Sequence, residues 1–574
     1  MSAEKSEAAA PEAPAAKPYK RIQYAVLGRE GLQFKLGPNK KRGELVQKDD
    51  PDSLFSKLEP PVKDFVYSAT DGSRVAVLRG TVVSVFDCDT GKLINSIERP
   101  NIMKMALSPL GTFLLTWEKY SAEVAQAGGN LTVWRVEDGN VMMRVIEKNL
   151  LDTTWPLVKW TDDENVAAYM VKNTVHMYDG TKLDRFTKVK IEGVSQFSIK
   201  KKDGPLSEDN PCRIAAFKPE SNSGPAKLSV LSYIGEPLDQ PTLTKSTFKA
   251  TECKFAWAAN GDAVLVKTET DVDTTGQSYY GESALYLLHA DGQYDAKIMP
   301  HKDDGPFHDF AWSPQGRVFV AISGRSPASS VLYNMKGDAI FDFGQAHRNT
   351  IRFSPHGRFL CLGGFGNLSG DMDFWDMNKK SRMGSVRANC AVSQEWSPCG
   401  RFFMTGTLFP RMRVDNGLSF YTYRGQHLFD VSVREATKAL FRPAAPGVYA
   451  DRPQTPLKKG EKAPSIEAGA GAKSGANGAP KKPAGVYRPP GASGSLAAQM
   501  RAEREGSTGP RKLTGLAALA AGGGSSMSNN TIPGMTPILD KKQSANPSGK
   551  SKAALRRERK KKAEAARKAA EEDA

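Results

Sequence analysis

The stretch EWSPCGRFFMTG, residues 395–406, places a Ser-Pro-Cys-Gly turn between two runs of strand-forming residues. Close copies occur as AWSPQGRVFVAISG at 311–324 and RFSPHGRFLCLGG at 352–364, and ALSPLGTFLLTWE at 106–118 is a fainter copy. Proline presets the φ angle at the second position of such a turn, and glycine supplies the positive φ that closes it. Each copy therefore predicts a β-hairpin, and their recurrence predicts a repeat fold.

The spacing of the copies indicates which repeat fold this is. Gly316 and Gly357 are 41 residues apart, and Gly357 and Gly400 are 43 apart. A second hairpin with a glycine turn follows each copy, at 330–344, 371–386 and 417–431. Two hairpins in about 40 residues are typical of one blade of a WD40-type β-propeller. Looser copies extend the pattern upstream at 66–97, 106–145, 158–180, 212–235 and 253–298.

Eight blades thus fit between about residues 62 and 431, and two strand-like segments remain. These are YAVLGREGLQFKL at 24–36 and TKALFR at 437–442. A ring leaves no exposed strand edge when both ends of the chain contribute strands to one blade. We therefore expect an all-β propeller of nine blades over residues 21–443, with eight blades and loose ends as the alternative.

Charge separates the expected ring from the rest of the chain. The total is +17, but residues 444–574 hold 24 Lys and Arg against 11 Asp and Glu, which leaves the preceding 443 residues with only +4. Residues 444–548 are rich in Pro, Gly, Ala, Ser and Lys, a composition that cannot bury enough apolar surface to fold. We expect disorder there, with short motifs, and also in residues 1–20.

Residues 549–574 are Ala-rich and predict a basic helical tail. This segment has no apolar stripe to pack on a core, and its charges oppose the helix dipole. We expect it to gain order when phosphates neutralise its cations, which makes it a candidate nucleic-acid-binding segment. A solvated tail without a ligand is the alternative. The candidate residues are Arg556, Arg557, Arg559, Lys560, Lys561 and Lys562.

Cysteine usage and the N-terminal composition predict the compartment. The six cysteines form no CxxC pair, as expected for single thiols in a reducing environment. The N-terminus has no apolar segment of a secretory signal, and no stretch approaches the roughly 20 apolar residues of a transmembrane helix. We expect a cytoplasmic monomer that does not enter a membrane.

The sequence gives no support for catalysis, a cofactor or a metal. GKS at 549–551 lacks the glycine that a phosphate-binding loop needs at position 544, which is Ser544. GGFGNLSG at 363–370 joins two expected strands rather than a strand and a helix, which argues against a dinucleotide-binding role. The seven histidines form no HExxH motif and no Cys/His cluster.

One loop of the expected ring is a candidate binding site. TLFPRMRVDNGLSFY at 407–421 places Arg411 and Arg413 before an Asp-Asn-Gly turn. Loops on a propeller face hold ligands on a rigid scaffold, and two arginines near a turn can clamp a phosphate or a carboxylate. The alternative is that Arg413 pairs with Asp415 and only fixes the turn.

Two stretches carry a family resemblance. SPHGRFLCLGGFGNLSGDMDFWD at 354–376 and WSPCGRFFMTGTLFPRMRVDNGLSFYTYRG at 396–425 resemble the eukaryotic translation initiation factor 2A family, above all in GFGNL and PRMRVDNG. The resemblance is strongest over the last four blades and is limited in the tail to VYRPP and basic character.

The resemblance implies a non-enzymatic cytoplasmic factor. Such a factor binds the small (40S) ribosomal subunit and promotes GTP-independent binding of initiator Met-tRNA on a subset of mRNAs, with other initiation factors as further partners. Two alternatives remain open: a scaffold like the propeller subunit of initiation factor 3, and a generic peptide-binding WD scaffold. An RNA-recognition domain, which the first alternative requires, does not fit into the roughly 20 residues before the first expected strand.

Overall fold

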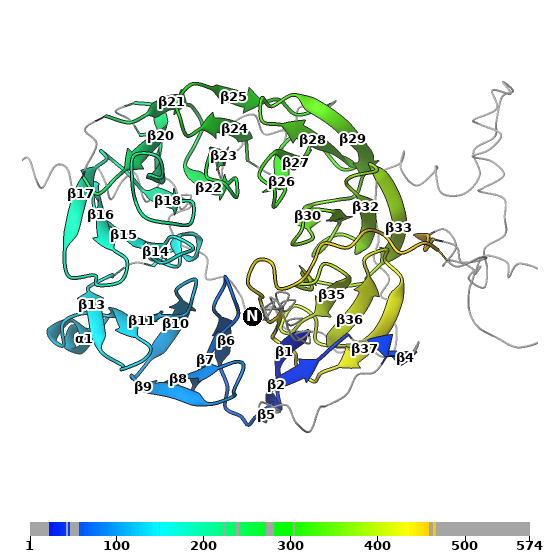
Figure 1. Ribbon diagram of the computed structural model, residues 1–574, viewed down its shortest axis with the longest axis horizontal. Coiled ribbons are helices and arrows are strands. Elements are labelled where there is room, and N and C mark those ends of the chain that lie inside the picture. Colours follow the sequence, from blue (N-terminus) through cyan, green and yellow to red (C-terminus); the bar gives the residue numbers. More distant parts are fainter. Residues whose placement is uncertain are drawn as a thin grey trace, which may run out of the picture. The chain divides into compact units, whose positions relative to one another are not determined.

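The computed structural model describes residues 22–38, 40–41, 44–45, 57–148, 150–221, 224–236, 240–270, 281–301, 305–457 and 463–466. The chain divides into two units, Met1–Gly475 and Ala476–Ala574, and every described residue lies in the first. Within this unit the described residues form nine four-stranded antiparallel sheets, arranged as blades around a central axis (Figure 1). The expected nine-bladed β-propeller is therefore confirmed.

Blades 1–4 follow one another along the chain, each with its strands in sequence order. Blade 1 contains β6 (Asp64–Tyr67), β7 (Arg74–Arg79), β8 (Val82–Asp87) and β9 (Leu93–Glu98). Blade 2 contains β10 (Ile102–Leu107), β11 (Phe113–Glu118), β12 (Leu131–Arg135) and β13 (Val141–Val145). Blade 3 contains β14 (Val158–Trp160), β15 (Val166–Val171), β16 (Thr174–Asp179) and β17 (Phe186–Lys190). Blade 4 contains β18 (Gln196–Lys200), β19 (Cys212–Lys218), β20 (Ala226–Tyr233) and β21 (Leu243–Thr247).

Blades 5–8 repeat this order. Blade 5 contains β22 (Glu252–Trp257), β23 (Ala263–Glu269), β24 (Ser283–His289) and β25 (Asp295–Ile298). Blade 6 contains β26 (Phe307–Trp312), β27 (Val318–Ser323), β28 (Ala328–Asn334) and β29 (Ala339–Ala346). Blade 7 contains β30 (Thr350–Phe353), β31 (Phe359–Gly363), β32 (Asp371–Asp376) and β33 (Ser381–Arg387). Blade 8 contains β34 (Ser393–Trp396), β35 (Phe402–Thr407), β36 (Gly417–Thr422) and β37 (His427–Ser432).

The ninth sheet, here called the closing blade, joins the two ends of the ring in the strand order β38-β1-β2-β5. Its strands are β38 (Lys438–Phe441), β1 (Gln23–Gly28), β2 (Gly31–Leu36) and β5 (Lys57–Leu58). A separate hairpin pairs β3 (Lys40–Lys41) with β4 (Glu44–Leu45), and two short helices, α1 (Ala122–Gln126) and η1 (Asp152–Thr154), lie in loops. Three strands of the shared blade, β38, β1 and β2, come from the two segments that the sequence left over, and the fourth, β5, lies outside them.

The Ser-Pro-x-Gly phrases form the turns that join the first and second strands of a blade, as predicted. In blade 7 the Ser354 carbonyl accepts a hydrogen bond from the Gly357 amide at 2.8 Å, and the Ser354 hydroxyl accepts one from the Phe359 amide at 3.0 Å. Gly357 has φ +73°, and a Cβ there would lie 2.9 Å from the Ser313 hydroxyl of the preceding blade. The glycine thus serves both the turn and the contact between blades.

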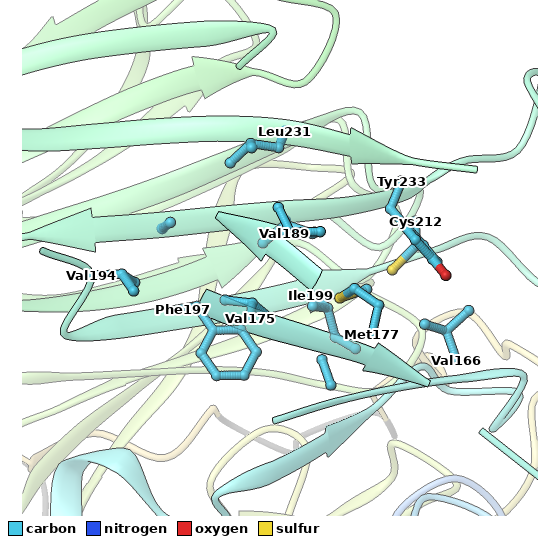
Figure 2. Close-up of a cluster of buried hydrophobic side chains, with 13 residues drawn as sticks. Val166, Val175, Met177, Val189, Val194, Phe197, Ile199, Cys212, Leu231 and Tyr233 are labelled. Carbon is cyan, nitrogen blue, oxygen red and sulfur yellow. The ribbon is translucent and has the colours of Figure 1, made fainter. Parts of the chain in front are cut away.

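The core lies between neighbouring blades rather than inside any one of them. Figure 2 shows the cluster between blades 3 and 4, where Val175 and Met177 of β16 face Phe197 and Ile199 of β18. The equivalent cluster between blade 8 and the closing blade brings Tyr24 within 5.0 Å of Phe420, measured between ring centroids. Each blade buries its apolar faces only when both neighbours are present, so closure of the ring stabilises all nine.

Polar side chains of the innermost strands also join several blades to their neighbours. In each case a side chain of one inner strand bonds a backbone group of the neighbouring inner strand, in place of the hydrogen bond that a continuous sheet would supply. The bonds are Lys159 Nζ to the Phe197 carbonyl (2.7 Å), the Ile351 amide to Asp309 Oδ2 (2.8 Å), the Phe441 amide to Glu395 Oε2 (2.9 Å) and Lys438 Nζ to the Phe65 carbonyl (2.7 Å).

After β38 the chain crosses blades 8 and 7 on the face that carries the Ser-Pro-x-Gly turns (Figure 1). We call residues 443–457 the strap. Its Tyr449 carbonyl is bonded to His356 at 2.8 Å, and its Asp451 forms a two-point ion pair with Arg358 at 2.6 and 2.8 Å. Composition predicts a linker from residue 444, but the chain stays against the ring to Thr455. It contacts the ring again at Pro464, whose carbonyl accepts a hydrogen bond from the Ser385 amide at 2.9 Å.

The six cysteines are free thiols that differ in burial. Five of the six are buried, and burial raises the pKa of Cys88 and of Cys212 to about 12. Cys390 is exposed, in the loop between β33 and β34. Its backbone has φ +58°, an uncommon conformation for a residue other than glycine.

Candidate nucleic-acid interface

The loop that carries Arg411 and Arg413 joins β35 to β36, on the face opposite the strap. Because the strands of a blade alternate in direction, the loops after second strands and the connections between blades share one face of the ring. Loop 408–416 follows the second strand of blade 8, and loop 364–370 follows the second strand of blade 7. Residues 433–437 connect blade 8 to the closing blade. These three segments meet at one part of the rim.

Loop 364–370 contains the GFGNL sequence and is held by one asparagine. The Asn349 side chain accepts a hydrogen bond from the Phe365 amide and donates one to the Phe365 carbonyl, both at 2.9 Å. Phe365 is buried, and the Gly366 amide donates to the Ala391 carbonyl at 3.3 Å. The loop joins two strands as expected and its backbone groups are used internally, which disfavours a phosphate-binding role for them.

Arg411 links this loop to its own. Its guanidinium Nη2 donates to the Asn367 side-chain oxygen, and the same nitrogen would lie 3.7 Å from a Cβ at Gly366. The two family-like sequences GFGNL and PRMRVDNG, more than 40 residues apart in the chain, therefore touch across the boundary between blades 7 and 8. Arg411 is exposed, so its remaining N–H groups face solvent.

Arg413 lies two residues further along, at the tip of a loop that Asn416 braces. The Asn416 side-chain Nδ2 donates to the Met412 carbonyl at 2.8 Å, and Val414, the residue after Arg413, is 64% exposed. Within the described part of the chain Arg413 forms no ion pair with Asp415 and no hydrogen bond. The turn is fixed by Asn416 instead, and Asp415 has φ +54°.

Two further arginines that the sequence analysis missed belong to the same rim. The Arg29 amide donates to the Arg434 carbonyl at 2.9 Å, and the Phe409 amide donates to the Ala436 carbonyl at 2.7 Å. These bonds place the β1–β2 turn and loop 433–437 beside loop 408–416. We call Arg29, Arg411, Arg413 and Arg434 the arginine rim. They are brought together by contacts between loops of the closed ring, which the sequence pattern around each arginine does not indicate.

Carboxylates balance part of this charge. Arg29 pairs with Glu435 at 3.1 Å, with the two side chains 56% and 42% exposed. At the end of loop 364–370, hydrogen bonds from the Arg387 guanidinium hold the pKa of Asp371 below its ordinary value. The rim therefore offers a few positioned guanidinium groups rather than a strong positive field, which suits contacts to individual phosphates.

The other predicted site residues lie outside the described part of the chain. They are Arg556, Arg557, Arg559, Lys560, Lys561 and Lys562. No group of three or more His, Cys, Asp or Glu side chains among the described residues is arranged to hold a metal ion. No helix in the described segments is both long and apolar enough to cross a membrane.

Comparisons with known proteins give the same family as the sequence resemblance. The model of the family described as eukaryotic translation initiation factor eIF2A matches residues 245–439. The chain is 38% identical over 386 residues to eukaryotic translation initiation factor 2A of Dictyostelium discoideum, covering 66% of this chain but only 61% of that protein. It is 31% identical over 507 residues to the factor of the same name from Schizosaccharomyces pombe, covering 85% of this chain and 81% of that protein.

A solved structure supports the fold. The crystal structure titled as that of the eukaryotic initiation factor superposes with a TM-score of 0.64 at 26% identity. It covers 75% of this chain and all of the compared chain.

Proposed function

This chain belongs to the eukaryotic translation initiation factor 2A family, a non-enzymatic family of translation initiation factors, and from this premise we propose that it brings initiator Met-tRNA to the small ribosomal subunit. In this proposal the step needs no GTP and serves a subset of mRNAs. The ring docks on the ribosome in the cytoplasm, and the basic tail holds RNA by its phosphates.

The observation that carries the proposal is the relationship to the Schizosaccharomyces pombe factor, which extends over 85% of this chain and 81% of that protein. The match is longer than the ring and includes sequence beyond it. The separation of charge fits the proposal, because a nearly balanced ring precedes a segment with a surplus of 13 positive charges. Cations concentrated in one segment bind phosphates by releasing counterions, without reading base sequence.

The tail can be tested in the full chain with purified small subunits and charged initiator tRNA in the absence of GTP. A variant changes six cations to Gln: Arg556, Arg557, Arg559, Lys560, Lys561 and Lys562. We expect factor-dependent tRNA binding to fall at least about tenfold, because six phosphate contacts are lost.

A matched control removes the same number of positive charges upstream of the tail. It changes Lys481, Lys482, Arg488, Arg501, Arg504 and Arg511 to Gln, and we expect it to retain most of the activity. Equal loss in both variants would show that only total charge matters. A wild-type chain that binds neither tRNA nor the small subunit, or that acts only with GTP, would contradict the proposal.

The arginine rim is tested separately by replacing Arg411 and Arg413 with Gln. Both side chains are exposed, so we expect the melting temperature to be preserved while affinity for the small subunit falls about tenfold. Arg325 and Arg382, exposed arginines outside the rim, serve as the control pair for the same double substitution. Unchanged affinity of the rim variant would remove the rim from the ribosome contact.

A further inference from the structure

The strap carries a threonine whose hydroxyl is held by an arginine of the ring. Thr455 Oγ1 accepts a hydrogen bond from Arg401 Nη2 at 2.8 Å, and the Thr455 carbonyl accepts one from Arg424 Nη2. The Thr455 amide donates to the Tyr423 hydroxyl at 3.0 Å. Thr455 is exposed and lies outside any helix or strand, so the segment can be lifted from the ring without breaking a sheet.

The sequence around Thr455 distinguishes it from every other Ser-Pro or Thr-Pro pair in the chain. Cyclin-dependent kinases, a class of proline-directed kinases, act on Ser or Thr before proline and favour a basic residue two positions after that proline. Among the pairs, only Thr455-Pro456-Leu457-Lys458 has this basic residue. The serines of the four Ser-Pro-x-Gly turns are buried and bonded within their turns; these are Ser108, Ser313, Ser354 and Ser397.

The surroundings of the Thr455 hydroxyl suit a phosphate. Arg401 stacks on the Tyr423 ring, with its guanidinium carbon 3.9 Å from the ring centroid, and Arg424 lies 5.3 Å from the same centroid. The contacts with Tyr423 help to position both guanidinium groups, whose N–H groups already reach Thr455, an arrangement that favours binding of phosphate oxygens. A third arginine, Arg358, is already neutralised by Asp451.

The carboxylates nearby are already engaged. Asp451 has its pKa lowered by the hydrogen bonds from Arg358. Asp376 accepts hydrogen bonds from the Gln454 side chain and from the Asn378 amide, the second at 2.9 Å. A phosphate on Thr455 would therefore meet two arginines whose charges no carboxylate within the described residues pairs with.

We propose that Thr455 is a phosphorylation site for a proline-directed kinase, and that Arg401 and Arg424 hold the phosphate and lock the strap onto blades 7 and 8. The Thr455 oxygen attacks the γ-phosphorus of MgATP, a P–O bond forms as the bond to ADP breaks, and the hydroxyl proton passes to the base of the kinase. The kinase acts on the lifted strap, and the phosphate stabilises the docked strap. At neutral pH the added group brings a charge of about −1.5 to −2 and three acceptor oxygens.

The test uses the full chain, MgATP and a cyclin-dependent kinase with its cyclin, with sites located by mass spectrometry. We expect phosphate on Thr455. We also expect amide hydrogen exchange of residues 449–457 to slow about tenfold after modification, because new charged hydrogen bonds oppose lifting of the strap. In 1 M salt this gain should shrink, since the contacts are partly exposed.

Matched variants distinguish binding of the phosphate by the two arginines from the phosphorylation of Thr455 itself. Arg401→Gln and Arg424→Gln should still accept the phosphate on Thr455 but lose most of the gain in protection, and Thr455→Val should lose the modification. Each variant is first checked for an unchanged melting temperature of the ring. Absence of phosphate on Thr455, faster exchange after modification, or the same gain in both arginine variants would overturn the proposal.

Discussion

Glu395 shows how single residues hold the ring closed. It lies on β34 and accepts the Phe441 amide of the closing strand β38 at 2.9 Å. Desolvation between the inner strands raises the pKa of its carboxyl to about 7, against which the Phe441 hydrogen bond acts only in part. A carboxyl with a raised pKa binds its proton more tightly in the folded state than in the unfolded chain, so ionisation costs stability.

This gives a pH-dependent prediction for Glu395→Gln. The cost of the wild-type carboxylate is absent below the unfolded pKa of about 4.3, grows as pH rises and is complete above about 7. Glutamine keeps an oxygen for the Phe441 amide and never ionises. We expect the variant to be more stable than wild type by about 3–4 kcal/mol at pH 8 and nearly equal to it near pH 4.5, as measured by denaturant unfolding. A difference that is constant with pH, or that grows toward acid, would contradict this assignment.

At the scale of elements, the turns of the repeat both form hairpins and join blades. Gly72 and Gly80 allow these two roles to be separated, because both have φ +61°. A Cβ at Gly72 would lie 2.2 Å from the Pro443 carbonyl oxygen, where the chain leaves the closing blade, whereas a Cβ at Gly80 meets nothing within 4 Å.

Alanine at the two positions should therefore have different effects. Gly80→Ala carries only the cost of an L-residue in the left-handed region, about 1–2 kcal/mol. Gly72→Ala adds a clash with backbone that must shift, and we expect it to cost at least about 2 kcal/mol more. Thermal melts of the two variants compare them directly. Equal melting temperatures would show that the close contact between Gly72 and Pro443 contributes nothing to ring closure.

The elements also show how far the sequence predicts this molecule. The Ser-Pro-x-Gly turns and three strands of the closing blade, β38, β1 and β2, follow from local turn chemistry and alternation, and the structure confirms them. Two features cannot be predicted from local sequence in this way. One is the contact of Arg411 with Asn367, and the other is the docking of the strap on the ring. Both depend on side chains that meet only after the ring closes, and the strap sequence alone has the composition of a linker. Arg358, Arg401 and Arg424 look like ordinary turn residues until the strap lies across them.

At the scale of the whole molecule, the closing blade makes the ring depend on both ends of the chain. Tyr24 of β1 packs against Phe420 of blade 8 and Phe441 of β38, and the β1–β38 pairing runs from Tyr24–Phe441 to Leu27–Lys438. We expect deletion of residues 1–40, which removes β1 and β2, to lower the melting temperature and to expose strand edges to proteolysis and aggregation. A truncated chain that melts like the full one would contradict closure by the shared blade.

The central claim is that a nearly neutral ring presents a separate basic arm that binds RNA. The most direct measurement is the salt dependence of initiator-tRNA binding by the full chain and by the variant lacking the six tail cations. A plot of log affinity against log salt concentration should lose a slope of about 4–5 in the variant, because each phosphate contact contributes roughly 0.7–0.9. An unchanged slope would show that the tail does not contact RNA and that the dominant cationic surface lies elsewhere.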